Sequence, residues 1–400
     1  MRGAFGSRDY RRFWAGSLVA NLGLWIQQIA LGWVVYDMTR SASWLGAVSF
    51  CGNLPTLLLG LLGGAIADRA SRRLIMTTSA LVLAACGFAL ATLMSGGWLT
   101  LSHIIGVAVV TGTAAAVYVP AMQSVIPSLV RSGDLMSAIS LNSVQFNLAR
   151  AVGPAIAGGL YGTIGPAGCF TINGGGFLVL TVALLTIRLP GRPSAPAPPI
   201  GRAVRDGLSY AYSHEIIGTA ILLAGAMSLF GFPYIIMLPA LARDTLGLDP
   251  AGLGYLMACM GGGAVVGGLL VAATGDRARR PGVASAGAIL FGLAMSAFAV
   301  VRSPIGTGLL LVALGGLQTI TVAALTTTVQ ATVFDGMRGR VMSMLTVVFF
   351  GFTTFGGLLV GLLADRIGVP AALAGGGGAT MLAALGLAAR RPDIGQRVEP

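Results

Sequence analysis

Charge is what this 400-residue chain has least of. Only 10% of its residues are Asp, Glu, Lys or Arg, whereas 55% are hydrophobic. Soluble globular proteins carry charge on about a quarter of their residues, because that charge keeps their surface in contact with water. The composition therefore excludes an ordinary soluble enzyme and indicates a protein that crosses a membrane many times.

The chain also has few of the residues from which disulfide and metal sites are built. Its four cysteines, Cys51, Cys86, Cys169 and Cys259, lie inside apolar runs and show no paired spacing. They predict packing rather than a disulfide framework or a zinc site. The glycine runs lack the strand, the following helix and the lysine of a nucleotide-binding loop. We therefore expect no enzyme, no cofactor and no metal.

Lysine is missing altogether, so all 25 basic residues are arginine and the formal net charge is +12. The arginines are scattered over short loops rather than gathered on one face, which argues against a nucleic-acid partner. The first apolar run begins at Phe13, behind Arg8, Arg11 and Arg12, and is long enough to span a bilayer. We expect it to remain as a helix and not to be cleaved as a signal peptide.

Apolar stretches near twenty residues predict an all-α membrane protein with about twelve transmembrane helices, since such a length crosses the hydrocarbon core. With both termini in the cytoplasm, the inner loops hold twenty arginines and the outer loops four. The positive-inside rule then predicts cytoplasmic termini. The expected spans are 13–36, 44–67, 74–94, 99–119, 137–162, 167–187, 216–240, 251–274, 282–301, 305–329, 341–363 and 370–389.

The apolar pattern stops between two halves of the chain. Residues 190–215 contain five prolines, which no spanning helix tolerates, so they predict a cytoplasmic linker. A short amphipathic helix is expected at its end. The linker separates a six-helix bundle over 1–189 from a second one over 216–400.

The two halves repeat one another. A shift of 208 positions places Leu45-Gly46 on Leu253-Gly254 and Asp68-Arg69 on Asp276-Arg277. A shift of 203 places Gly153 and Gly158 on Gly356 and Gly361. Parallel repeats of this kind are typical of transporters whose substrate site lies near the midplane between the halves.

Two motifs carry a family resemblance. The turn Gly64-x-Ile66-Ala67-Asp68-Arg69-x-x-Arg72-Arg73 resembles the loop 2–3 signature of the major facilitator superfamily, with Ser71 where glycine is usual. In the fifth span, Gly153-Pro154-Ala155-Ile156-Ala157-Gly158-Gly159 resembles the motif of drug:proton antiporters, with Ala157 in place of a glycine. The first span and the turn after it are similar to the branch that contains enterobactin exporters and macrolide or multidrug efflux proteins.

This resemblance implies export of an amphiphilic small molecule, drug-like or siderophore-like, across the bacterial plasma membrane. It implies alternating access in exchange for protons, with the proton gradient as the energy source. The expected partners are the substrate and the lipid bilayer, and the expected state is a monomer. A lipid or lysolipid transporter of the same fold and a transport-dead membrane sensor are the alternatives. No Asp or Glu lies in the middle of a predicted span, so proton coupling is implied by the resemblance alone.

The charged turn is a candidate gate made by Gly64, Asp68, Arg69, Arg72 and Arg73. The carboxylate of Asp68 lies among three guanidinium groups and is suited to charge-assisted hydrogen bonds or to a helix N-terminus. We expect this cluster to bind the cytoplasmic end of the eleventh span when the protein opens outward. The alternative is that the arginines only anchor the topology.

Arg150 is the one ionisable residue predicted deep in a span. A buried guanidinium is costly unless it is paired or hydrated, so Arg150 is expected to face a central cavity and to contact substrate or assist coupling. Asn142 and Phe146 share its helical face. A structural bond to carbonyl groups or to Asn147 is the alternative.

Further substrate candidates form a polar and aromatic stripe in the first span, where Asn21, Trp25 and Gln28 share one face. These side chains either line a cavity or make interhelical hydrogen bonds. In the second half the candidates, which are otherwise lipid-facing or core residues, are Phe230 and Tyr234 around a helix break expected at Gly231 and Pro233, and Gln318, Phe349 and Phe352.

Two titratable groups near the outer surface complete the set. Asp37 ends the first span and is either the proton carrier, with a raised pKa, or a partner of Arg40. His103 is a second candidate, since imidazole titrates near neutrality, or else a surface histidine.

Overall fold

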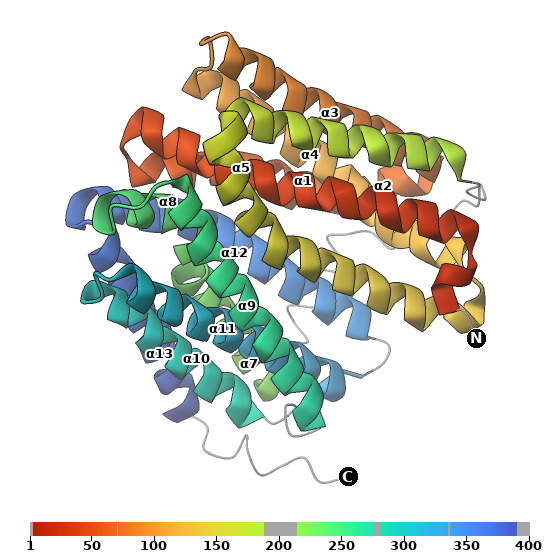
Figure 1. The fold of residues 1–400 in the computed structure, drawn as a ribbon. Helices are drawn as coiled ribbons and strands as arrows, with labels where there is room; N and C mark the ends of the chain where they lie inside the picture. Colours follow the sequence, from red (N-terminus) through yellow and green to blue (C-terminus); the bar gives the residue numbers. More distant parts are fainter. Residues whose placement is uncertain (1–2, 70, 188–213, 276–280, 335–336, 390–400) are drawn as a thin grey trace. The chain divides into compact units, whose positions relative to one another are not determined.

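The computed structural model describes residues 3–69, 71–187, 214–275, 281–334 and 337–389, without the side chains of 60–69, 281 and 299. Every regular element within these ranges is a helix (Figure 1). Ten of the described helical stretches are long and apolar enough to cross a membrane, and Gly282–Ser296 is a shorter apolar helix. The expectation of an all-α membrane protein is confirmed at this level.

Most of the described helices begin and end within a few residues of the expected spans, but the span 216–240 is divided between two α-helices, and the spans 137–162 and 167–187 fall in one helix. Before residue 190 they are α1 (Arg8–Thr39), α2 (Ala42–Arg69), α3 (Arg72–Ser95), α4 (Leu101–Val125) and α5 (Leu135–Thr186). After residue 213 they are α7 (Glu215–Ala226), α8 (Tyr234–Ala240), α9 (Pro250–Thr274), α10 (Pro281–Ser296), α11 (Pro304–Thr332), α12 (Arg338–Ile367) and α13 (Val369–Ala389).

Helix α5 is the main departure from a one-span, one-helix pattern. Its 52 residues would measure ~78 Å if straight, far more than a bilayer core of about 30 Å. Gly165 interrupts it with φ 68° and ψ −179°, and Pro166 follows. Glycine takes a positive φ without the penalty of a side chain. The chain changes direction there (Figure 1), between the expected spans 137–162 and 167–187.

Short polar caps set the starts of three helices. Ser71 accepts a hydrogen bond from the Leu74 amide at the start of α3, and Ser303 accepts one from the Gly306 amide at the start of α11. Thr100 opens α4. These side chains satisfy amide groups that have no partner inside the first helical turn, which a membrane surface would otherwise leave exposed.

The chain forms two compact units. Unit 1 comprises Met1–Met38, Cys51–Ala197 and Pro250–Tyr255, and unit 2 comprises Thr39–Phe50, Pro198–Asp249 and Leu256–Pro400. Within unit 1, α3 lies against α4 and α5; within unit 2, α10 lies against α11 and α13. Helix α2 thus begins in unit 2 and continues in unit 1, and α9 does the reverse. The linker predicted over residues 190–215 falls almost entirely outside the described residues.

Helices of unit 1 approach one another closely where glycines face them. A Cβ added at Gly176 of α5 would lie 2.9 Å from the Val19 carbonyl oxygen of α1. Beside this contact the buried Asn173 Nδ2 donates a hydrogen bond to Gln27 Oε1 over 2.8 Å. Lipid supplies little hydrophobic drive between helices, so close backbone approach and interhelical hydrogen bonds hold α1 to α5.

Substitution at two adjacent glycines separates this contact from general helix effects. Gly176→Val places a side chain against α1 and should lower the free energy of unfolding by about 1–3 kcal/mol. Gly175→Val is the matched control, because nothing lies within 4 Å of a Cβ added there. The thermal midpoints of the purified variants in one detergent check this. Equal midpoints for both variants would show that close approach at Gly176 does not hold the helices together.

Candidate functional site

Two of the predicted side chains of unit 2 meet directly. The Tyr234 hydroxyl donates a hydrogen bond to Gln318 Oε1 over 3.1 Å, which joins the start of α8 to the middle of α11. Tyr234 is fully buried and Gln318 is half-buried. A buried phenol needs such a partner, so the contact fixes where the ring lies.

A chain of phenylalanine contacts leads from Tyr234 of this pair. The rings of Phe232 and Phe349 are stacked, with centroids 6.1 Å apart and an interplanar angle of 11°. Phe291 lies edge-on to Phe232 and to Tyr234, at 6.3 Å and 5.9 Å. We call Phe232, Tyr234, Phe291 and Phe349 the aromatic cluster. Aromatic pairs in these geometries attract one another beyond the burial of their surface.

A break in the helix makes room for the cluster. Residues Met227–Gly231 form a π-helical turn, and Pro233 precedes the start of α8. A Cβ added at Gly231 would lie 2.8 Å from the Phe291 ring, so only glycine leaves space for that ring. The break expected around Gly231 and Pro233 is present, and such π-turns are frequent at functional sites.

The sequence reading missed Phe232 and Phe291, because each is one aromatic residue within an apolar run. Two candidates that it named, Phe230 and Phe352, are not among the four rings of the cluster. Phe230 is half-buried, and Phe352 is 44% exposed.

In unit 1 the predicted stripe of α1 meets the predicted face of α5. The rings of Trp25 and Phe146 lie edge-on with centroids 6.4 Å apart. A Cβ added at Gly153 would lie 2.6 Å from Trp25 Cβ, so this glycine of the antiporter-like motif leaves room for the tryptophan. The indole Nε1 of Trp25 is buried and has no hydrogen-bond partner among the described residues.

The polar candidates of unit 1 have different surroundings. Asn21, Asn142 and Arg150 are half-buried, and Arg150 interacts with its neighbours. Gln28 is exposed, whereas Gln27 beside it is the buried glutamine that pairs with α5.

Asn147, the alternative partner proposed for Arg150, is exposed, and its Nδ2 donates to the Ser143 carbonyl of its own helix. The sequence reading also missed Gln145. Its side chain is fully buried, and both polar atoms of its amide lack a partner within the described part of the chain.

The antiporter-like motif also packs α5 against another helix of unit 1. A Cβ added at Gly158 would lie 3.1 Å from the Cα atoms of Ala251 and Gly254 at the start of α9. A Cβ at Gly254 would lie 2.8 Å from the Pro154 carbonyl oxygen. At Gly159 an added Cβ would meet nothing within 4 Å. The motif therefore brings two backbones together at Gly158 and leaves room for a side chain at Gly153.

Part of the predicted gate lies outside what the structure describes. The side chains of Gly64, Asp68 and Arg69 belong to the residues 60–69 that are left out. Arg72 Nη1 donates to the Ser124 carbonyl at the end of α4 over 3.3 Å.

Arg73 of the same turn reaches another helix end, where its Nη2 donates to the Leu185 carbonyl of α5. Within unit 1, Arg72 and Arg73 therefore tie the start of α3 to the last carbonyl groups of α4 and α5. Positive groups are favourable at such positions, because helix C-termini carry partial negative charge.

The two titratable candidates, Asp37 and His103, are exposed. Asp37 lies in the last turn of α1 and interacts with its neighbours. His103 forms a capping box with Thr100 at the start of α4, where Nδ1 and the threonine hydroxyl are 2.9 Å apart. Its position is that of a surface histidine with a structural contact.

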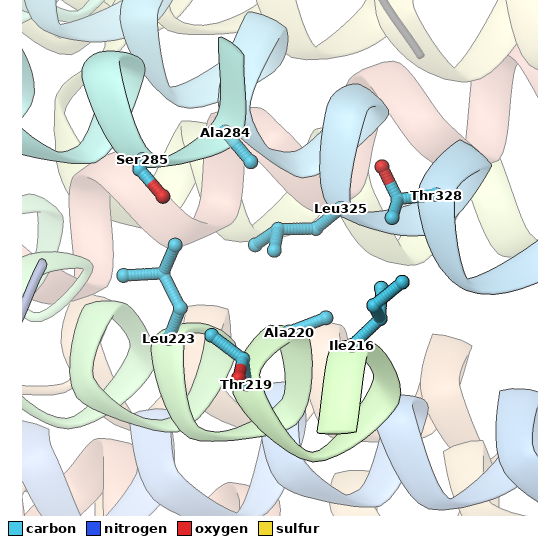
Figure 2. A pocket seen from close by; sticks show the side chains of 8 residues that line it. All are labelled: Ile216, Thr219, Ala220, Leu223, Ala284, Ser285, Leu325 and Thr328. Carbon is cyan, nitrogen blue, oxygen red and sulfur yellow. The ribbon is translucent and has the colours of Figure 1, made fainter. Parts of the chain in front are cut away.

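A separate crevice lies in unit 2 between α7, α10 and α11 (Figure 2). Its space of about 310 Å³ includes open solvent. The hydroxyl of Thr219, one of its lining residues, donates a hydrogen bond to the Glu215 carbonyl of its own helix. None of the candidate substrate residues lines the crevice. The crevice is lined by Ile216, Thr219, Ala220, Leu223, Ala284, Ser285, Leu325 and Thr328.

Within the described residues, no group of three or more His, Cys, Asp and Glu side chains lies close enough together to hold a metal ion.

Several known transport proteins are similar to this chain in sequence. Over 362 residues the chain is 24% identical to macrolide efflux protein A of Streptococcus pyogenes, a match that covers 89% of both chains. It is 26% identical over 366 residues to the multidrug efflux pump Tap of Mycolicibacterium fortuitum, again over 89% of both. A 37% identical match over 148 residues, to the staphyloferrin A transporter of Staphylococcus aureus, covers only 37% of that protein.

Solved structures share the fold at low sequence identity. A bacterial homologue of the human lysosomal transporter Spinster, inward-facing and unoccupied, is 17% identical with a TM-score of 0.72 and covers 97% of both chains. The nucleoside transporter NupG is 14% identical with a TM-score of 0.76, over 96% of this chain and 98% of that one.

The family described as transmembrane secretion effector matches residues 4–395, nearly the whole chain. The predicted resemblance to the efflux branch of the major facilitator superfamily is confirmed. Because the family match spans all described helices, the chain belongs to the transmembrane secretion effector family of the major facilitator superfamily and is a multi-pass protein of the bacterial plasma membrane.

Proposed function

We propose that this protein is a secondary active exporter that moves an amphiphilic small molecule out of the cytoplasm by alternating access. One observation carries the proposal: unit 2 places aromatic rings beside the Gln318 amide, and unit 1 places two aromatic rings at a buried indole N–H, in a chain that matches efflux proteins along 89% of its length. Apolar rings with a few directed polar groups suit a ligand that is part apolar and part polar.

We propose substrate-contacting residues in each unit separately. In unit 2 they are the stacked ring of Phe349 and the amide of Gln318, with Tyr234 holding the amide. In unit 1 they are Phe146 and Trp25, whose Nε1 is free to donate to a substrate oxygen. We also propose as substrate-contacting residues the other candidates named from the sequence, including Asn21, Gln28, Asn142, Phe230 and Phe352.

A siderophore-like anion is a second candidate substrate. Arg150 favours it, since arginine stays protonated at any accessible pH and attracts negative charge. The similarity of 148 residues to a staphyloferrin A transporter supports the same class. In a flux assay, a lipid or lysolipid transporter would move lysolipids rather than drug-like compounds. A sensor would bind a ligand without moving it.

We propose twelve membrane crossings with both termini in the cytoplasm. The arginine distribution supports this orientation. The structure supports the number when α5 counts as two crossings on either side of Gly165 and the shorter α10 counts as one. The charged turn at Asp68 then lies in the cytoplasm, where we propose that it acts as a gate.

Proton exchange is the proposed energy source, on the strength of the family resemblance. The 13 acidic residues all lie near span ends or in loops. Asp37 is the acid nearest to the proposed path, and Arg150 would favour the ionised form of any acid that approaches it.

Cysteine labelling in a cysteine-free background tests the orientation. A cysteine at position 244 should react with a membrane-impermeant maleimide added to intact cells, because the arginine count predicts that residues 242–250 lie outside. A cysteine at position 71 should react only after the cells are opened. Reaction of position 71 from outside intact cells would overturn the orientation.

Substitution of Arg150 tests its electrostatic role. Arg150→Ala should lower efflux per inserted protein at least about tenfold, equivalent to about 1.4 kcal/mol. Arg150→Lys should retain part of the activity, because it keeps the charge. Efflux of a fluorescent amphiphile from energised cells measures both.

The matched control for this test is Thr353→Ala. Thr353 is the counterpart of Arg150 under the 203-residue shift, and its hydroxyl donates to the Phe349 carbonyl of its own helix over 2.7 Å. Efflux of this variant should stay close to that of the unmodified protein. If Arg150→Ala unfolds at lower temperature while its folded fraction exports normally, the arginine is structural.

A further inference from the structure

A single carboxylate in unit 2 holds the start of one helix to the end of another. Ser41 Oγ donates to Asp365 Oδ2 over 2.6 Å, the Ala42 amide donates to Oδ1 over 2.6 Å, and the Ser43 amide donates to Oδ2 over 3.2 Å. The Ser43 hydroxyl also donates to this carboxylate. Asp365 lies in the last turn of α12, and α2 begins at Ala42.

These bonds use donors that the helix itself leaves unsatisfied. The first amides of α2 have no carbonyl partner within the helix, and the N-terminus carries partial positive charge. A carboxylate is the side chain best suited to this position, because its hydrogen bonds are charge-assisted. Two serine hydroxyls add to the two amides, so both oxygens of Asp365 are engaged.

From the carboxylate onward, residues 42–50 of α2 lie directly along residues 355–361 of α12. A Cβ added at Gly361 would lie 2.6 Å from the Ala42 carbonyl oxygen, and one at Gly46 would lie 2.9 Å from the Leu358 Cα. Further along, the rings of Phe50 and Phe355 meet edge-on with centroids 5.4 Å apart. The contact therefore runs over more than two helical turns and ends at the carboxylate.

The contact between α9 and α5 in unit 1 is the repeat counterpart of this one, and it lacks the carboxylate. Gly254 and Gly158 there correspond to Gly46 and Gly361 under the two repeat shifts. The counterpart of Asp365 is Gly162, where an added Cβ would meet nothing within 4 Å. Close glycine packing is thus common to both contacts, whereas the carboxylate is an addition to one of them.

The sequence around Asp365 has the same spacing as the predicted gate. Gly361-x-x-Ala364-Asp365-Arg366 repeats Gly64-x-x-Ala67-Asp68-Arg69 at the end of α2. The proposed topology places these two acid–arginine pairs on opposite sides of the membrane. Helix α2 therefore has an acid at its own C-terminal end and receives one from α12 at its N-terminal end.

We propose that Asp365 is a positioning residue that latches the first turn of α2 to the last turn of α12 at the outer face, and that transport requires this latch to open. Because α2 begins in unit 2 and continues in unit 1, the latch sets which unit the first two turns of α2 follow. Its place on the outer face rests on the proposed orientation.

The test measures access to the contact with a reporter cysteine. Leu358→Cys is introduced into a protein in which the four native cysteines are replaced. An impermeant maleimide is then applied to intact cells and to inside-out vesicles. Asp365→Asn and Asp365→Ala should raise the labelling rate in intact cells about tenfold, within the usual range of conformational coupling. Ser41→Ala with Ser43→Ala should raise it less, because both amide donors remain.

The matched control is Asp244→Asn, which removes an exposed acid of unit 2 outside the latch and should leave labelling unchanged. Unchanged labelling from both sides in folded Asp365 variants would overturn the latch. Faster labelling only in inside-out vesicles would contradict the proposed outer location, although the contact itself would be upheld.

A covalent latch covers the case in which Asp365→Ala fails to fold. Ser43→Cys combined with Asp365→Cys should form a disulfide on mild oxidation that stops efflux, and a reductant should restore it. Normal efflux by fully cross-linked protein would show that the latch need not open. If even the reduced protein and the unmodified protein export nothing, the proposed function fails while cross-linking still reports the contact.

Discussion

The interior of a bilayer offers no water to a backbone, so every amide and carbonyl inside it must bond within the protein. Helices satisfy this demand alone, but lipid then provides little reason for them to associate. This protein associates its helices through glycine. Gly176 against α1 and Gly361 against α2 bring backbones to distances at which an added Cβ would clash, and Gly158 against α9 leaves an added Cβ only a tight fit. The hydrogen bonds between helices form where these glycines let the helices come close, as at Asn173 beside Gly176 and at Asp365 beside Gly361.

Ionised groups are concentrated at helix ends, where they join one element to another. Arg72 and Arg73 bind terminal carbonyl groups of α4 and α5, and Asp365 binds the first amides of α2. Each pairing matches the partial charge of a helix terminus. Away from the ends, amide and phenol groups take over, as in Tyr234 with Gln318 and Gln27 with Asn173.

Most span limits could be predicted from the sequence, because an apolar run of about twenty residues is the length that crosses the hydrocarbon core of a bilayer. The break near Gly231 and Pro233 followed from residue chemistry, and Gly165 with Pro166 falls between two expected spans. Which residues meet across helices did not follow. In a membrane helix both the lipid face and the packed face are apolar, so periodicity does not separate Gln27 from Gln28.

Phe232 and Phe291 escaped notice for the same reason, since their contact joins separate helices. Asp365 was within reach of the sequence, because Gly361-x-x-Ala364-Asp365-Arg366 repeats the spacing of the predicted gate. Its partners at Ser41 to Ser43 could come only from the structure. The side chain of Asp68 lies outside the described residues, so its role as a gate stays a prediction.

Flux through purified protein tests the account most directly. Proteoliposomes with an acidic interior are given uncharged, anionic and cationic amphiphiles, and protein-free vesicles correct for trapping of weak bases and acids. The account predicts that an uncharged or anionic amphiphile accumulates several-fold more with the proton gradient than without it, and that a protonophore abolishes the difference. Saturable binding without accumulation under any gradient would contradict it and indicate a sensor.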